Sequence, residues 1–137
     1  MDHPLDNATP MLLRNRRGTS AAAFIEYLCC ASALRSAESR FQRAKPEFIQ
    51  HCQRLYAEQR GLCAVSGVRM IYGWHVKHPR QISIDRIDHC KGYEVGNVRL
   101  VTWFVNNARS NMSDDVLLFF AREIVKNEDL KGGKPLQ

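Results

Sequence analysis

The chain has 137 residues, 45% of them hydrophobic and 25% charged, which is ordinary for one globular domain with a real apolar core. Lys and Arg outnumber Asp and Glu by 20 to 14, so the formal net charge is +6, and this excess favours polyanionic partners, nucleic acid first. No apolar run reaches the ~18 residues of a membrane span, and the first ten residues lack a signal-peptide core, so we expect a cytoplasmic protein with no membrane partner.

The first 18 residues are predicted to form a flexible basic arm, because they combine two prolines with Arg14, Arg16 and Arg17. The alternative is a solvated tail without a partner. A helix is expected to begin after Thr19 or Ser20, either of which can cap it. Apolar residues recur at helical spacing and form one stripe along this helix: Phe24, Leu28, Ala31, Leu34 and Phe41.

A second helix is predicted to begin at Pro46, because Lys45 precedes a proline and therefore avoids the α region. Phe48, Cys52 and Leu55 share one face of this helix, which should end near residues 60–61. Residues 19–60 are thus expected to be helical.

The pattern changes after Gly61. Residues 62–74 combine two glycines with short apolar pieces, which predicts a hairpin or an irregular ribbon. Residues 81–87 alternate as a strand, 92–97 form a loop, and 97–101 form a second strand. Helical spacing follows in 102–111. Ser113, before two aspartates, starts a last helix whose broad apolar face should close the domain. The fold class is α+β, in one compact domain with a tail at 131–137.

Three polar residues in 83–111 occur in a regular order along the predicted strands and helix. Asp85 lies on the first strand, Asn97 opens the second, and Asn106 follows nine positions later, with Arg109 beyond it. With Cys63 and Gly67 upstream, this order resembles the HNH (His-Me finger, ββα-metal) endonuclease family. The segment D-R-I-D replaces the family's Asp-His, a version similar to small proteins of phages and bacteria. The resemblance covers about 50 residues, from Gly61 to Asn111, and implies a ββα finger in 61–130.

The resemblance implies a catalytic divalent metal, Mg²⁺ or Mn²⁺, on Asp85 and Asn106, since hard oxygen ligands suit these ions. It gives Asn97 the role of orienting the loop between the strands. The other interpretation of Asn97 is a turn residue after glycine. Asn107 points about 100° away from Asn106 on a helix, so only one of them should face the metal.

Structural zinc is not expected. Of the four cysteine positions of the family's zinc-supported branch, Cys63 remains, and the others are occupied by Ser66, Thr102 and Val105. One thiol cannot hold zinc at a structural site. Apolar packing should replace the ion, through Leu62, Val65, Val101, Trp103 and Phe104. The five cysteines include no C-x-x-C pair and are expected to be reduced.

Arg86 stands where the family has its catalytic histidine. A guanidinium remains protonated and cannot accept a proton from water, so we assign Arg86 to the scissile phosphate as a clamp. His89 is the first candidate for the base, although an ordinary loop histidine is equally open. His75 and His78 are further candidates or surface residues. Asp88 is either a second metal ligand or a loop cap.

The basic residues predicted to contact nucleic acid are Arg14, Arg16, Arg17, Lys77, Arg80, Arg99 and Arg109. Any of them could instead be a solvated charge. The sequence therefore predicts a metal-dependent nuclease that hydrolyses phosphodiester bonds of DNA, perhaps one strand at a time, in a bacterial or phage-infected cell. The alternative is a degenerate HNH-fold binding module that recognises nucleic acid or a protein partner, as a phage accessory or inhibitor. The oligomeric state stays open.

Overall fold

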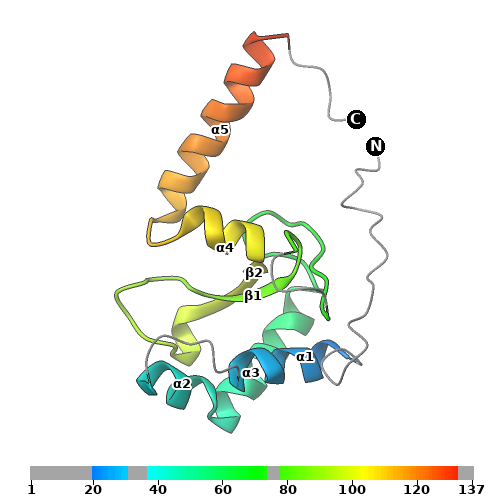
Figure 1. Ribbon diagram of the computed structural model, residues 1–137, viewed down its shortest axis with the longest axis vertical. Helices are drawn as coiled ribbons and strands as arrows, with labels where there is room; N and C mark the ends of the chain where they lie inside the picture. The colour runs from blue at the N-terminus through cyan, green and yellow to red at the C-terminus, as the bar shows by residue number, and fades with distance from the viewer. Residues whose placement is uncertain (1–19, 31–36, 74–77, 133–137) are drawn as a thin grey trace.

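The computed structural model describes residues 20–30, 37–73 and 78–132. The elements follow the α+β order expected from the sequence (Figure 1). They are the helices α1 (Ala21–Cys30), α2 (Ala37–Arg43) and α3 (Pro46–Glu58), the strand β1 (Ile82–Arg86), a 3₁₀ turn (Val95–Asn97), the strand β2 (Val98–Thr102), and the helices α4 (Trp103–Arg109) and α5 (Asp114–Leu130).

The N-terminal helices differ from the single helix predicted up to residue 44. The Ser20 hydroxyl caps α1 as expected, accepting a hydrogen bond from the Ala23 amide at 3.1 Å. However, α1 ends at Cys30, and α2 is a separate helix. Phe41 on α2 is 68% exposed, so its assignment to the core stripe is wrong. Ala31 and Leu34 lie outside the described residues.

The α3 helix confirms the prediction made from Pro46. Phe48 and Cys52 are buried on its inner face, and the chain leaves the helix through Arg60 and Gly61, both with positive φ. After it, residues 61–71 form an irregular ribbon held by the bridge between Leu62 and Arg69.

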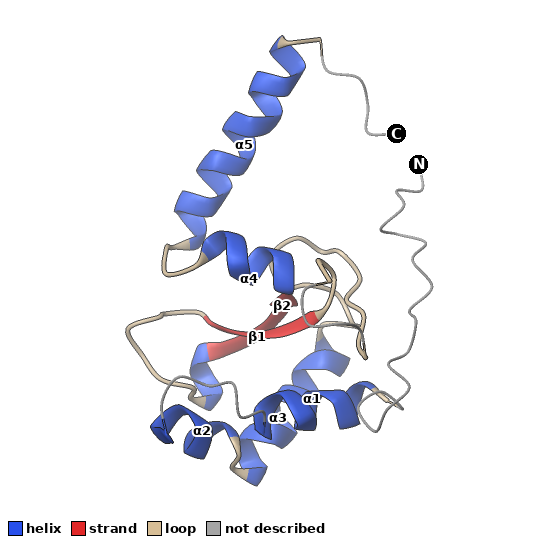
Figure 2. Cartoon of the chain, viewed as in Figure 1, coloured by secondary structure: helices blue, strands red, loops and turns tan. Residues whose placement is uncertain are grey.

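The strands β1 and β2 form an antiparallel pair in which Asp85 lies opposite Arg99 and Arg86 opposite Val98. Because side chains alternate along a strand, this register divides the hairpin into an apolar face and a polar face. Ile82, Ile84 and Leu100 belong to the first, which packs against α1 and α3 to form the core. Asp85 and Arg99 belong to the second, on which α4 packs. Figure 2 shows α4 lying across this side of the two strands.

The last helix does not close the domain. Ser113 caps α5 as predicted, accepting from the Val116 amide at 3.4 Å, but α5 contains no buried residue. Figure 1 shows it leaving the body beyond α4. The expectation of a closing helix is therefore wrong: its apolar face points into solvent. Among the described helices, none has the length and apolar character to cross a membrane.

Candidate functional site

Asp85 is the centre of a buried ion-pair network. Its side chain is 4% exposed, and both of its oxygens are engaged. Oδ1 accepts from Arg109 Nη1 at 2.9 Å, and Oδ2 accepts from Arg99 Nε at 2.9 Å and from Arg109 Nη1 at 3.2 Å. Arg109 is also buried and further donates to the backbone carbonyls of Arg86 and Ile87. This guanidinium thus joins α4 to the end of β1.

Asp114, the first residue of α5, completes the network. It accepts from Arg99 Nη1 at 2.7 Å and Nη2 at 2.6 Å, a bidentate pair, and its Oδ1 lies 2.9 Å from Arg109 Nε. The hydrogen bonds from Arg99 hold the pKa of Asp114 below its usual range, and the same bonds raise the pKa of Arg99. Two carboxylates and two guanidiniums therefore form a closed set with no net charge.

The arrangement does not provide the metal cradle predicted from Asp85 and Asn106. A cation would have to displace guanidiniums from both oxygens of Asp85. Asn106 does lie beside the same strand, but its amide nitrogen donates to the Ser83 hydroxyl at 2.6 Å. Asn106 and Asn107 line an open depression with Trp103 and Ser110. As arranged here, the residues at the predicted position do not fit a divalent metal.

Asn97 fixes the loop between the strands, as the resemblance implied. Its Oδ1 accepts from the Asp88 amide at 2.9 Å, and its Nδ2 donates to the carbonyls of Asp88 at 3.0 Å and Gly92 at 2.9 Å. The side chain is buried. Three hydrogen bonds to backbone groups across the loop exceed what a simple turn residue makes, so Asn97 sets the position of residues 88–92.

Arg86 does not face Asp85. The two residues alternate along β1, and the Arg86 guanidinium carbon lies 5.2 Å from the centre of the Tyr93 ring. Arg43 of α2 also stacks on Tyr93, at 4.7 Å, and Arg86 donates weakly to the Lys91 carbonyl at 3.3 Å. Among the described residues no carboxylate pairs with Arg86. Its half-buried cation is therefore held by an aromatic ring, on the side of the hairpin away from Asn106.

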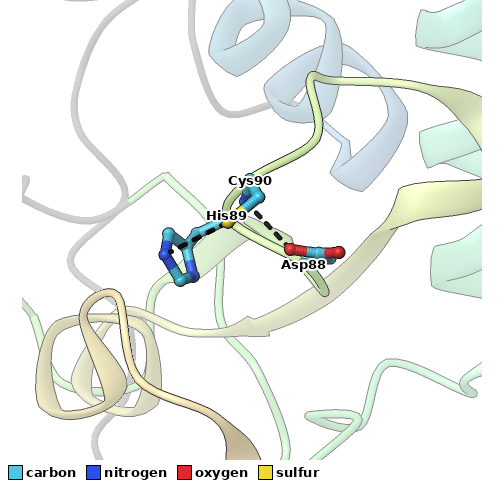
Figure 3. Close-up of side chains that lie close together, drawn as sticks. All are labelled: Asp88, His89 and Cys90. Atoms are coloured by element: carbon cyan, nitrogen blue, oxygen red, sulfur yellow. Dashed lines mark hydrogen bonds between the residues drawn. The ribbon is translucent and has the colours of Figure 1, made fainter.

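His89 lies on the same loop, between Asp88 and Cys90 (Figure 3). One ligand atom from each of these residues lies within 4.8 Å of the others. Within the group, Asp88 Oδ1 accepts from the Cys90 amide at 2.9 Å, so Asp88 caps the loop as one interpretation proposed. His89 and Cys90 are exposed. His78 accepts from the Arg80 amide through Nδ1 at 3.1 Å, whereas His75 lies outside the described residues.

Cys63, Ser66, Thr102 and Val105, the positions at which zinc ligands were considered from the sequence, lie together. The Cys63 sulfur accepts from the amides of Ser66 at 3.5 Å and Thr102 at 3.4 Å, and the Thr102 hydroxyl accepts from the Val105 amide at 3.3 Å. Cys63, Thr102 and Val105 are buried. A small hydrogen-bonded cluster thus joins the ribbon to the start of α4.

Apolar packing around this cluster follows the prediction in part. Val101 is fully buried and Val65 packs against the core. Phe104, which was expected in the core, is 61% exposed because it lies on the outer side of α4. All five cysteines of the chain are free.

The residues predicted to contact nucleic acid are differently placed. Arg14, Arg16, Arg17 and Lys77 lie outside the described residues. Arg80 is buried and donates through Nε to the Arg69 carbonyl at 2.9 Å, and Arg99 and Arg109 belong to the ion-pair network. These three arginines therefore bind protein groups, where a surface cation was expected.

No family model, no curated protein and no solved structure matches the chain. Interpretation therefore depends on the geometry. Three residues of these contacts were not predicted from the sequence. Asp114 was interpreted only as a helix-start residue, and Tyr93 and Arg43 were not considered. The available signal for Asp114 was its place in the chain, just beyond Arg109 and a short turn.

Proposed function

We propose that this chain is a nucleic-acid-binding module with an HNH-like scaffold, in which the aspartate at the family's metal position serves as the centre of a structural ion-pair network. One observation carries the proposal: both oxygens of buried Asp85 are engaged by Arg99 and Arg109. Breaking such a pair leaves an uncompensated buried charge, so Asp85 is not available for a metal in this arrangement.

Two further features support an HNH-like scaffold. The side chain of Asn97 holds the loop between the strands by three hydrogen bonds. The clustering of Cys63, Ser66 and Thr102 brings together positions that correspond to zinc ligands in the family. Both features maintain the scaffold, and neither supplies a catalytic group.

The binding surface we assign contains Arg86, Tyr93 and Lys91. Arg86 lacks a carboxylate partner among the described residues and is held in place by the Tyr93 ring, while Lys91 on the same loop is exposed. A pre-positioned guanidinium suits phosphate recognition, because its planar donors match two phosphate oxygens. The net charge of +6 adds long-range attraction.

The test is titration of a fluorescent 20-base-pair DNA with the full chain at several salt concentrations. We expect a linear fall of log K with log salt concentration. Arg86→Ala and Lys91→Ala should each weaken binding and reduce the slope by about 0.9 if each contacts one phosphate. Arg122→Ala is the matched control, because Arg122 is an exposed cation on α5. Absence of binding at low salt, or equal effects of all three substitutions, would contradict the proposal.

A nuclease remains the second candidate because of the group Asp88, His89 and Cys90. Its nitrogen and sulfur donors suit Zn²⁺, Ni²⁺ or Co²⁺ better than Mg²⁺. The measurement is nicking of supercoiled plasmid with each of these ions and with Mg²⁺ and Mn²⁺. Cleavage that disappears in His89→Ala and persists in Arg122→Ala would favour the nuclease over the binding module. Without cleavage under all these conditions, the nuclease candidate fails.

A further inference from the structure

The α5 helix exposes an apolar stripe that nothing in the described chain covers. Its members Leu117, Phe120, Ala121, Ile124 and Val125 follow one another at spacings of one, three and four residues, which puts them on one face. Phe120, Ile124 and Val125 are 57%, 68% and 60% exposed. Only Leu117, near the start of the helix, packs against the core. We call this set the α5 stripe.

The opposite side of α5 is polar. Arg122, Glu123, Lys126 and Asp129 lie there, and all are exposed. The first turn is held to the body by the bonds between Arg99 and Asp114, while the remaining helix extends away from it (Figure 1). In proteins most helical stability comes from tertiary packing of an apolar face, and no residue of the 17-residue α5 is buried. The exposed stripe therefore needs a partner surface.

The available area is sufficient for a helix pair. A fully exposed large apolar residue offers about 150–250 Å². Phe120, Ile124 and Val125 of the stripe are exposed by 57–68%, and Leu118 beside the stripe by 38%. Together they supply roughly 400 Å² of apolar surface. Two such surfaces with their polar flanks approach the ~1,000 Å² at which specific interfaces begin. An interface at this lower limit belongs to the weak or transient class.

Charge selects the type of partner. Between Asp114 and Leu130 the helix carries five acidic and two basic residues, so anionic lipid and nucleic acid are repelled. A second copy carries the same charges, but most of them lie on the side of α5 away from the stripe and do not meet across a pair. An identical apolar stripe is complementary to itself across a two-fold axis. We infer that α5 is a dimerisation helix, which pairs with α5 of a second copy of this chain.

The pairing direction follows from Glu128, which lies four residues beyond Ile124 on the line of the stripe. A parallel pair would put Glu128 opposite the same residue of the other copy. An antiparallel pair centred near Phe120 and Ala121 puts Glu128 beside the other copy's helix start at Ser113, where Arg99 already neutralises Asp114 and the helix dipole favours negative charge. The antiparallel order is therefore preferred, and it keeps the two bodies apart.

The experiment is sedimentation equilibrium of nucleic-acid-free full chain from about 1 to 200 µM, a range suited to a weak interface. Wild type should change from monomer to dimer and remain dimeric in 1 M NaCl. Phe120→Asp and Ile124→Asp should each raise the dissociation constant at least about 30-fold. The matched control is Phe119→Asp: Phe119 is 56% exposed and lies about 100° further round the helix, off the stripe. Because its ring contacts that of Phe120 edge-on, with centroids 5.2 Å apart, its variant should weaken the dimer far less than Phe120→Asp does.

Circular dichroism checks that the substitutions do not unfold the chain. At a concentration where wild type is monomeric, all three variants should keep the circular dichroism spectrum and the thermal transition of the wild-type body. Wild type that remains monomeric throughout, or a Phe119→Asp variant that dissociates as much as Phe120→Asp, would overturn the inference. Glu128→Gln should weaken the dimer about twofold, whereas tighter association would overturn the antiparallel order. None of these outcomes depends on whether the chain binds nucleic acid.

Discussion

Replacing Asp85 with asparagine tests the role of the buried carboxylate most directly. The substitution keeps the shape but removes the charge that faces Arg99 and Arg109, and it turns an amide NH₂ toward a cation. Removing one partner of a buried ion pair typically costs ~3–5 kcal/mol. Arg109 retains the carbonyls of Arg86 and Ile87, and Arg99 retains Asp114. We therefore expect a loss at the lower end, about 3 kcal/mol.

The assay is urea unfolding at pH 7, followed by circular dichroism, with every variant at one protein concentration because dimerisation would shift apparent stability. A loss of ~3 kcal/mol is large beside the ~5–15 kcal/mol of a typical domain, so the midpoint should fall clearly while the slope with urea is unchanged. Asp115→Asn is the control, since Asp115 is exposed beside Asp114 and should change stability by less than about 0.5 kcal/mol.

The opposite result has a definite meaning. A carboxylate kept for a metal ion destabilises the protein without that ion, so its neutralisation would leave stability unchanged or increase it. If Asp85→Asn is as stable as wild type, or more stable, Asp85 is not a structural centre and the proposed binding module loses its main support.

Three other predictions follow from the same geometry. Asn97→Ala removes three hydrogen bonds to the loop backbone and should cost about 2 kcal/mol, with faster hydrogen exchange at the Asp88 amide; unchanged exchange there would contradict the anchoring role. Arg99 lowers the pKa of Asp114, so this pair contributes stability above the unfolded-state pKa of ~3.9, and that stability is lost as pH falls through the lower folded-state pKa. Asp114→Asn should therefore reduce the acid dependence of stability in urea titrations from pH 2 to 6. An identical pH profile for the variant and the wild type would refute this. Cys30 and Cys90 are exposed and the other three cysteines buried, so a thiol reagent should label two groups rapidly in the native protein and five after unfolding, whereas five rapid reactions would contradict the core.

The sequence predicted local structure where a local cause exists. Ser20 and Ser113 cap helices because their hydroxyls accept from amides three residues on, and Pro46 begins α3 for the same kind of reason. The alternation in 81–87 placed β1 correctly. These features depend on neighbours in the chain, which the sequence lists directly.

The sequence could not predict which apolar face becomes core. Phe41 and the α5 stripe have the same periodicity as the buried face of α3, yet both are exposed. Periodicity shows that a helix has an apolar side, but what covers that side is decided by packing between distant elements. An apolar face for the core and one for a second copy look the same in a single sequence.

The candidate site shows the same limit for polar residues. The spacing of Asp85, Asn97 and Asn106 led to a nuclease, but it says nothing about Arg99 and Arg109, whose side chains converge on Asp85 only after β2 and α4 have packed. The sequence placed these arginines at the surface because a cation is usually exposed. The cost of removing these guanidiniums from water is offset because each one is paired with a carboxylate.

The charge of the ion-pair network is consistent with an arginine, and not a histidine, at position 86. Asp85 and Asp114 contribute two negative charges, and Arg99 and Arg109 two positive ones, so the set has no net charge to attract a cation. A divalent ion ~4 Å from one guanidinium is repelled by about 8 kcal/mol at an effective dielectric constant of ~20, twice the value for unit charges. The repulsion from two guanidiniums therefore cancels the attraction of the two carboxylates. A general base at position 86 would have no metal to act with, and this position is free to carry an arginine that faces Tyr93 and the solvent.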